Sequence, residues 1–456
     1  MPGLNVSLLT ALQGLQAQQG ALQATTNNIA NANTPGYSRQ VPIMVENPPV
    51  LNGSLLYGTG VHLQEFKSVR DQVLDLLIAQ QTQHQGAADA QTNALQQLQP
   101  VFTATGQDIG SQMSAFFTSI TKLSTDPSDS ALRASFISAG NNLANSFHQT
   151  VANVQQIQTG LNQSVVQDVN QINVLTSQIS SLNEQLYQLR GTGQDGGALQ
   201  DQQTELIRQL SELTNISVTS TENGETITTA NGVALVVGGQ QYPLHTTLDP
   251  DGTQHVYAAN IDITSQINGG KMGGELTVRD QNIAAIMSNL DTLASEFATA
   301  FNAIHRAGYD INGTAGTDFF SVPGTVAGAA SHIAVNISDA ALVAASSDGS
   351  AGSNGNLSAL LALQNQALGS GQTPTEAYAS MVFQVGLSTA NAKADSQGSQ
   401  LTLQQLTNQR SALSGVSIDE ESTNLIRYQQ AYAAAARVIT TVDQLTNITL
   451  NMMSGN

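Results

Sequence analysis

The first 38 residues contain no charged side chain, and this feature limits the possible folds more than any other; the first charge is Arg39. Apolar residues recur within this neutral stretch at alternating spacings of four and three residues. Such a spacing predicts a helix with one apolar stripe. The stripe consists of Leu8, Leu12, Leu15, Leu22 and Ile29, with Gln19 and Thr26 at the two remaining positions. A helix with this stripe and no charged face fits either a helical bundle or a contact between subunits.

The first helix should end near Asn33, because two residues later the chain contains a proline. Pro35 disfavours the helical conformation of Thr34. The pair Pro35-Gly36 is typical of the two central positions of a type II turn. We therefore expect the chain to reverse direction at this point.

A second apolar stripe occupies the other end of the chain, again with spacings of three and four. It is formed by Leu425, Tyr428, Tyr432, Ala435, Ile439 and Val442. After a shift of one residue, Leu445, Ile448 and Met452 are expected to continue it. Two such helices, one at each terminus, can pair as an antiparallel coiled coil. The outer sides of the pair would remain apolar, which favours contacts with further copies.

Two polar signatures accompany these stripes. Residues 27–37 have the sequence Asn-Asn-Ile-Ala-Asn-Ala-Asn-Thr-Pro-Gly-Tyr and continue as Ser-Arg-Gln, whereas residues 414–421 have the sequence Ser-Gly-Val-Ser-Ile-Asp-Glu-Glu. Residues 424–432 follow as Asn-Leu-Ile-Arg-Tyr-Gln-Gln-Ala-Tyr. The first signature resembles that of bacterial flagellar axial proteins. Together they resemble the hook-associated branch of this family, although the N-terminal signature alone would also fit rod and hook subunits.

This resemblance implies a structural subunit at the hook–filament junction, located outside the cell. It further implies self-association in a ring or helical layer, with hook protein on one side and a second junction protein on the other. A cytosolic export chaperone would bind the C-terminal segment, and export would use the flagellar type III pathway. The N-terminus lacks the basic and apolar regions of a cleavable signal peptide.

We expect the terminal segments to be disordered in the monomer and to fold into the coiled coil on assembly, because their stripes need more partner surface than one chain offers. The tyrosines are either packing residues of the seam or contacts to neighbouring subunits. The predicted assembly interface comprises Leu8, Leu12, Leu15, Leu22, Asn27, Asn28, Ile29, Asn31, Pro35, Gly36, Tyr37, Leu425, Tyr428, Tyr432, Ile439 and Val442.

The predicted fold class is mainly α with a small β insertion. Residues 1–40 and 416–456 should form the terminal coiled-coil region. An elongated helical rod should combine residues 41–213, 273–306 and 357–415, and residues 214–272 should form an inserted β region with hairpin turns. Residues 307–356 are either loops or an extension of this β region.

The rod helices can be delimited from periodicity and caps. We expect helices over 68–98, ending at Pro100, and over 109–123; a long helix capped by Asp126 should run to Arg190, with a break at Gly160 left open. Further helices are expected over 199–213, 276–306, 357–368 and 374–413, the last opened by a capping box of Thr373 and Glu376. The segment 41–63 should be an extended connector with short strands at most.

Composition excludes several functions. Asp and Glu number 33 against 14 Lys and Arg, for a net charge of −19. An acidic chain without a basic patch is a poor binder of nucleic-acid phosphates and of anionic membrane surfaces. No run approaches 18 apolar residues, so we expect no membrane-spanning segment. The chain has no Cys, which excludes thiolate chemistry. We expect no catalytic residue, metal or cofactor.

Two motifs could suggest otherwise. Residues 191–196 match the pattern G-x-G-x-x-G, but a dinucleotide site requires a preceding strand, and a heptad helix precedes this loop. The acidic cluster Asp419-Glu420-Glu421 is expected to be a helix cap, with Ser417 and Glu420 as a capping box. A nucleotide-binding module therefore remains only a distant alternative to an axial subunit.

Overall fold

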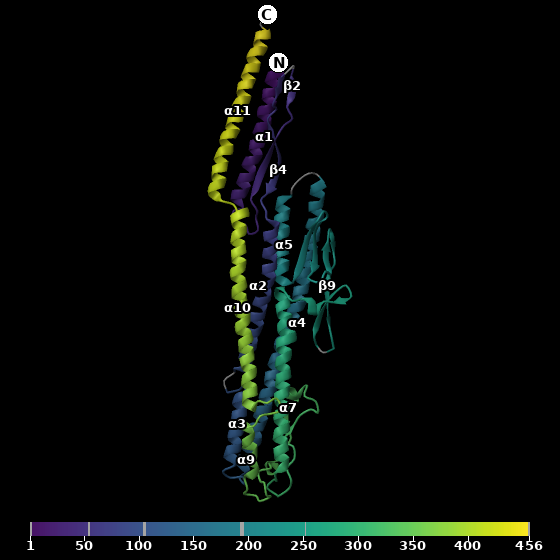
Figure 1. Ribbon diagram of the computed structural model, residues 1–456, viewed down its shortest axis with the longest axis vertical. Coiled ribbons are helices and arrows are strands. Elements are labelled where there is room, and N and C mark those ends of the chain that lie inside the picture. Colours follow the sequence, from purple (N-terminus) through teal and green to yellow (C-terminus); the bar gives the residue numbers. More distant parts are fainter. Residues whose placement is uncertain (1, 53–54, 104–105, 192–195, 251, 455–456) are drawn as a thin grey trace.

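The computed structural model describes residues 2–52, 55–103, 106–191, 196–250 and 252–454. The molecule is long and narrow, and both chain ends lie at the same pole (Figure 1). Long helices follow one another from this pole to the opposite one, and a small β region lies on one flank (Figure 1). The predicted fold class, mainly α with a β insertion, is confirmed.

The pole with the termini contains two antiparallel helices, α1 (Pro2–Ala30) and α11 (Ile418–Ser454) (Figure 1). Beside them run strands β1 (Gln40–Glu46) and β4 (Val61–Ser68), which form an antiparallel ladder. The ladder continues into a small hairpin of β2 (Val50–Asn52) and β3 (Leu55–Tyr57). The expected connector is thus more regular than predicted. Pro42 is tolerated because a two-stranded ladder leaves one side of each strand unpaired.

The rod is built around α2 (Gln72–Phe102), α4 (Ser130–Gly191) and α10 (Pro374–Ser414), joined by α5 (Gly197–Leu213) and α6 (Gly270–Thr277). A π-helical turn, η2 (Val278–Ile283), connects α6 to α7 (Ala284–Ala307). Helix α4 is unbroken over 62 residues and is therefore about 93 Å long. Chain segments far apart in the sequence lie side by side, because α10 packs along α2.

Several predicted helix boundaries of the rod were wrong. The helix expected from 68 begins at Gln72, because Ser68 is the last residue of β4, and the helix expected over 357–368 ends at Ala362. Helix α2 continues through Pro100 to Phe102, whose ring is buried and whose carbonyl accepts a hydrogen bond of 2.9 Å from the Tyr378 hydroxyl. Helix α4 is capped by Asp129, whose carboxylate accepts from the backbone amides of residues 131 and 132, and not by Asp126. The helix expected at 276 begins at Gly270. The capping box of Thr373 and Glu376 is confirmed.

The β region packs on α4. A four-stranded sheet contains β5 (Ile216–Thr221), β6 (Gly224–Thr229), β7 (Ala234–Val237) and β8 (Gln240–Gln241). A three-stranded sheet contains β9 (Leu244–Leu248), β10 (Gln254–Ala258) and β11 (Ile261–Asp262), followed by the short helix η1 (Thr264–Gln266). Their apolar faces meet α4, α5 and α6 in one hydrophobic cluster, here named the β-side core, whose buried members lie between Ala79 and Leu276.

The pole opposite the termini holds a second cluster, the base core, whose buried members lie between Ala94 and Ala392. Aromatic rings dominate it; Phe116 packs against Phe136 with ring centroids 5.2 Å apart. The remaining short elements surround this core: α3 (Ile109–Leu123), β12 (Phe320–Ser321), α8 (Ala329–His332), β13 (Ala334–Val335), η3 (Ala340–Leu342), α9 (Gly355–Ala362) and η4 (Leu363–Asn365). Residues 307–356 therefore contribute to the base core and do not extend the β region, because their apolar side chains pack on α4 and α7.

Candidate assembly interface

Helix α1 buries a face of small residues, not the leucine stripe that the sequence suggested. The buried side chains of this helix are Ala11, Ala17, Ala21, Ala24, Thr25 and Asn28. Leu8 and Leu12 are 38% and 43% exposed, and Leu15, Leu22 and Ile29 are only half-buried. Small side chains let neighbouring elements approach closely: a Cβ at Gly20 would lie 2.4 Å from Leu63 of β4.

Helix α11 presents the predicted seam to α1 up to Val442, which is 7% exposed. Leu425, Tyr428, Tyr432, Ala435 and Ile439 are half-buried along the same face. Beyond Val442 the half-buried positions are Thr446 and Thr449, which keep the spacing without a shift. The predicted continuation was wrong, because Leu445, Ile448 and Met452 are 47%, 51% and 75% exposed.

The N- and C-terminal signatures meet where the helix pair joins the rod. Asn28 lies at the centre, 1% exposed, and its Nδ2 donates to the Gln40 carbonyl at 2.9 Å and to the Glu421 carboxylate at 3.2 Å. Its Oδ1 accepts from the Tyr37 hydroxyl at 2.8 Å and from the Gln40 amide at 2.9 Å. One buried amide thus joins α1, β1 and α11.

A second set of contacts ties the start of α11 to the chain after the turn. The Arg39 amide donates to the Ser414 carbonyl at 2.9 Å, and the Arg39 guanidinium forms an ion pair of 2.8 Å with Glu420. The expected capping box is therefore not closed: the Glu420 amide reaches the Ser417 hydroxyl only at 3.5 Å, while its carboxylate binds Arg39. Asp419 lies in the first helical turn, where an acid stabilises the helix.

The turn itself is held by α10. Gly36 has φ of +80°, and the Tyr37 amide donates to the Thr34 carbonyl at 3.2 Å, as expected for a type II turn. Arg410 donates to the Gly36 carbonyl at 2.9 Å and to the Ser38 hydroxyl at 3.2 Å, and its Nε donates to Asp75 at 2.8 Å. One arginine therefore binds the turn to α10 and α2.

A buried acid, Asp201 of α5, completes the arrangement. Its carboxylate accepts from the Ser38 amide at 3.1 Å and pairs with Arg70. Burial raises the pKa of Asp201, and the neighbouring Arg70 opposes this shift. Burial, together with the carboxylates of Asp201 and Glu421, raises the pKa of the Tyr37 hydroxyl to about 12. Tyr37 is thus a neutral hydrogen-bond donor at physiological pH.

We name this cluster the polar joint. It consists of Asn28, Tyr37, Ser38, Arg39, Gln40, Arg70, Asp75, Asp201, Arg410, Glu420 and Glu421. It borders a cleft of about 890 Å³ lined by the turn, α2, α5 and α10. The sequence pointed to its signature residues but missed Arg70, Asp75, Asp201 and Arg410. The available signal was rarity, since charged residues are only 10% of the chain and a buried charged side chain usually has a partner.

The other predicted site residues have local roles or lie at the surface. Asn31, the residue after α1, donates to the Asn27 carbonyl at 3.0 Å, and the Asn27 amide donates to the Tyr37 hydroxyl at 3.4 Å. Pro35 is exposed at the turn. The segment 192–195 of the G-x-G-x-x-G motif lies outside the described residues. Gly191 ends α4 and Gly196 precedes α5, so helices, not a strand, flank the motif.

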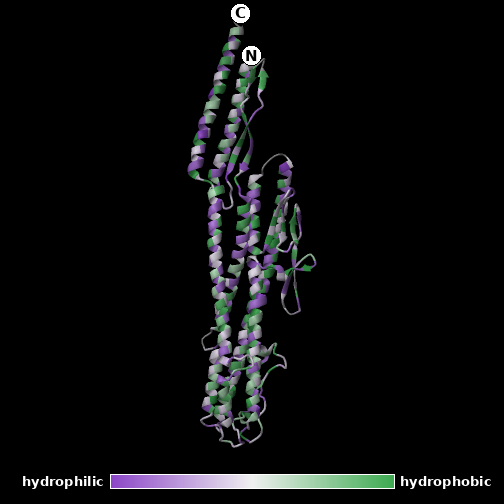
Figure 2. Cartoon of the chain, in the orientation of Figure 1, coloured by the Kyte–Doolittle hydropathy of each residue, from purple (hydrophilic) through white to green (hydrophobic). Residues whose placement is uncertain are grey.

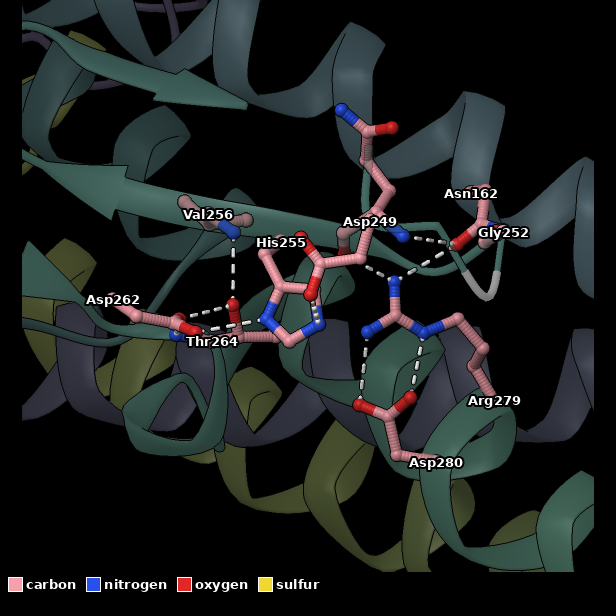
Figure 3. A network of polar contacts seen from close by, with 10 residues as sticks. Asn162, Asp249, Gly252, His255, Val256, Asp262, Thr264, Arg279 and Asp280 are labelled. Atoms are coloured by element: carbon pink, nitrogen blue, oxygen red, sulfur yellow. Dashed lines mark hydrogen bonds and ion pairs between the residues drawn. The ribbon is translucent and has the colours of Figure 1, made fainter. Parts of the chain in front are cut away.

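A further polar cluster fixes the β region to the rod (Figure 3). The Arg279 guanidinium, 1% exposed, binds Asp280 through two hydrogen bonds of 2.6 and 3.0 Å. It also donates to Asn162 of α4 at 2.9 Å and to the Gln254 carbonyl of β10 at 2.6 Å. Arg279 lies in the π-helical turn. These contacts tie β10, α4 and the π-helical turn together.

The described residues contain no helix that is long and apolar enough to cross a membrane. Within the same residues, no group of three His, Asp or Glu side chains is arranged as a metal site would require.

Comparisons with known proteins agree along the whole chain. Family models match at residues 8–37 (flagella basal body rod protein), 95–320 (flagellar hook-associated protein FlgK helical domain) and 408–452 (flagellar basal body rod FlgEFG protein C-terminal). The chain is 29% identical to flagellar hook-associated protein 1 of Escherichia coli over 97% of its own length and 98% of the relative's. It is 29% identical to that of Bacillus subtilis, over 98% of both chains.

A solved structure has the same fold. The flagellar hook junction protein FlgK from Burkholderia pseudomallei matches with a TM-score of 0.67 and 16% identity, covering 74% of this chain and all of that one. The paired terminal helices and the matching family models define a flagellar axial protein, a structural component of the extracellular flagellum. Within that class, the chain belongs to the flagellar hook-associated protein 1 family.

Proposed function

We propose that this chain forms the layer between hook and filament, and that its terminal helices become ordered only when subunits assemble there. The assembly role is assigned to residues 1–40 and 416–456. The rod (41–213, 273–306 and 357–415) and the β region (214–272) would set the outer shape. Its partners would be further copies of the chain, hook protein, a second junction protein and, before export through the type III pathway, a cytosolic chaperone on the C-terminal segment.

One observation carries this proposal: the two terminal helices contribute no side chain to either hydrophobic core. Among the described residues, no side chain of α1 or α11 belongs to the β-side core or the base core. The face that α1 buries consists mainly of alanines, which contribute little apolar area. Ordering each residue costs about 1–2 kcal/mol in backbone entropy, so an isolated pair of this kind has little net stability.

Neighbouring subunits can supply the missing area. Leu8, Leu9 and Leu12 of α1 are exposed, as are Leu445, Ile448 and Met452 of α11. If assembly buried about 1,000 Å² of apolar surface per subunit, the gross gain would be about 25 kcal/mol. Because α1 carries no charged side chain, burial of its surface would place no unpaired side-chain ion in the interface.

Hydrogen exchange on the purified monomer, and then on the same protein bound to isolated hooks, tests this proposal. We expect residues 2–38 and 416–454 to exchange rapidly in the monomer and slowly on hooks, while the base core is protected in both states. Protection of both ends in the monomer, unchanged by hooks, would instead indicate a self-contained bundle.

A hook or rod subunit is the alternative within the same class. The family model for the hook-associated helical domain, which matches residues 95–320, favours the junction subunit. Binding of the protein to rods in preference to isolated hooks would support the alternative.

A further inference from the structure

The hairpin of β2 and β3 exposes apolar side chains on both of its faces. Val50, Leu51, Leu55, Leu56 and Tyr57 are 48%, 65%, 61%, 66% and 41% exposed. Leu51 pairs with Leu56, and Val50 pairs with Tyr57, so neighbouring pairs point to opposite faces. The two strands of this hairpin have the colour of hydrophobic residues in Figure 2. An isolated two-stranded hairpin has marginal stability in water, and one with two apolar faces needs a partner surface.

The base of the hairpin is fixed to α1, which determines where its strands lie along that helix. Asn47 donates to Gln13 at 2.7 Å, and Gly60 lies so close to Thr10 that a Cβ there would be 2.9 Å from its methyl group. Leu51 lies about 13 Å further along the strand, a distance that corresponds to about nine residues of helix. Leu51 is therefore level with the first turn of α1, near Leu4.

The outer stripe of α11 lies at the same level. Asn28 of α1 contacts Glu421, and from this contact the two antiparallel helices run towards the same pole. As many residues separate Asn28 from Leu4 in α1 as separate Glu421 from Leu445 in α11. Leu445 therefore lies level with Leu4. The stripe continues with Ile448 and Met452, and lies about 100° around the helix from the seam that faces α1.

The hairpin and the helix flank α1 on opposite sides in Figure 1. Two different apolar surfaces, level with each other and on opposite sides of one subunit, are what a head-to-tail contact around a ring requires. The surfaces also match in charge: residues 47–61 contain no charged residue, and residues 438–452 contain only Asp443.

We propose that the β2–β3 hairpin of one subunit packs on the outer stripe of α11, formed by Leu445, Ile448 and Met452, of the next copy in the layer. This inference rests on the proposed function, since it names the contact by which copies join laterally. The occupant of the hairpin surface is thus a second copy of this chain, and the contact repeats from subunit to subunit.

Because the chain lacks cysteine, engineered cysteines allow a clean test. Leu56→Cys protein is mixed with Leu445→Cys protein, bound to isolated hooks and treated with a short bismaleimide crosslinker. The matched control replaces Leu445→Cys with Ile426→Cys, on the same helix and 56% exposed, but nearer the polar joint. We expect at least tenfold more crosslinked dimer for the 56–445 pair than for the 56–426 pair, and no dimer without hooks.

Cosedimentation of the unmodified protein with hooks separates the possible failures. If the unmodified protein sediments with hooks but the two pairs crosslink equally, or Leu56→Cys joins to hook protein instead, the lateral contact is wrong and the junction function stands. If it does not sediment with hooks, the proposed function fails, and this contact fails with it. Circular dichroism of each cysteine variant establishes that the rod is folded before mixing.

Discussion

Asn28 and Glu421 lie 393 residues apart in the chain, yet the side-chain amide of one donates to the carboxylate of the other at 3.2 Å. Both side chains are buried, at 1% and 3% exposed. The contact couples the end of α1 to the first turn of α11. Because Asn28 also binds both backbone groups of Gln40, it sets the direction in which the helix pair leaves the rod.

Replacement of Asn28 by Ala should therefore loosen the joint. Burying polar groups without a partner costs about 1–3 kcal/mol. On hooks, we expect the Gln40 amide to exchange about ten- to a hundredfold faster in Asn28→Ala than in the natural protein. Asn33→Ala, at an exposed position after α1, is the control and should leave this rate unchanged. If the Gln40 amide exchanges at the same rate in Asn28→Ala and in the natural protein, the polar joint does not depend on the Asn28 side chain.

Charges placed on the terminal stripes should block assembly without unfolding the rod. We expect Leu15→Asp and Ile439→Asp to retain the melting temperature of the natural protein, because neither residue belongs to a core, and to lose incorporation at hook tips. Electron microscopy of hooks with labelled protein measures incorporation. Leu401→Asp, 68% exposed on the rod helix α10, should incorporate normally. Normal incorporation of either stripe variant would contradict the mechanism.

Removal of one ring from the base core should lower rod stability. Phe116 is fully buried and lies within 5.9 Å, between ring centroids, of Phe301 and Phe319. Phe116→Ala should lower the free energy of unfolding by about 3–5 kcal/mol. Phe383→Ala removes a ring that is 65% exposed and should change it by less than about 1 kcal/mol. Thermal or urea unfolding followed by circular dichroism distinguishes the two.

Rod stability should also depend on pH through Glu275. Burial beside Asp168 raises the pKa of Glu275 to about 7, and its Oε1 accepts from the Ser164 hydroxyl at 2.6 Å. A raised pKa means that the folded state favours the protonated acid. The resulting contribution to the free energy of unfolding is complete below the ordinary pKa of a glutamate, and this contribution is lost as pH rises through about 7.

Glu275→Gln, which keeps the shape without the charge, should remove this loss. We expect the melting temperature of the variant to exceed that of the natural protein at pH 8, with the difference shrinking towards pH 5. His305, whose pKa burial lowers, contributes with the opposite sign but is shared by both proteins and cancels in the difference. Glu184→Gln, on the exposed side of α4, is the control. A difference independent of pH would exclude titration of Glu275 as the cause.

The periodicity of the sequence was sufficient to predict the helical architecture, but it did not predict which face of α1 is buried. Leucine spacing identified the helix correctly, yet the structure buries Ala17, Ala21 and Ala24 instead. An alanine carries little weight in a hydrophobicity pattern, although its small size allows a close approach of elements such as β4. The leucines dominate the pattern because they are strongly hydrophobic. Leu8 and Leu12 nevertheless remain exposed, so they are available for contacts with other molecules.

The polar joint was only half predictable. Its signature residues are contiguous in the sequence, and a resemblance could point to them. Arg70 lies between β4 and α2, whereas Asp201 and Arg410 belong to α5 and α10, and each has an ordinary local sequence. Their roles arise from the placement of α5 and α10 beside the turn, which is a property of the tertiary fold. The same limitation explains Glu420, whose carboxylate binds Arg39 and not its own helix cap.

The two cores differ in how much of the chain they need, and this difference allows one core to close before the other. The β-side core takes its buried residues from positions 79 to 276, so a chain that emerges N-terminus first can close it before the later residues arrive. The base core cannot be completed until the chain also includes Tyr378, Met381, Val385 and Ala392. Among the described elements, α1 precedes both cores and its partner α11 follows them, so this helix pair can form only after the residues of both cores have been made.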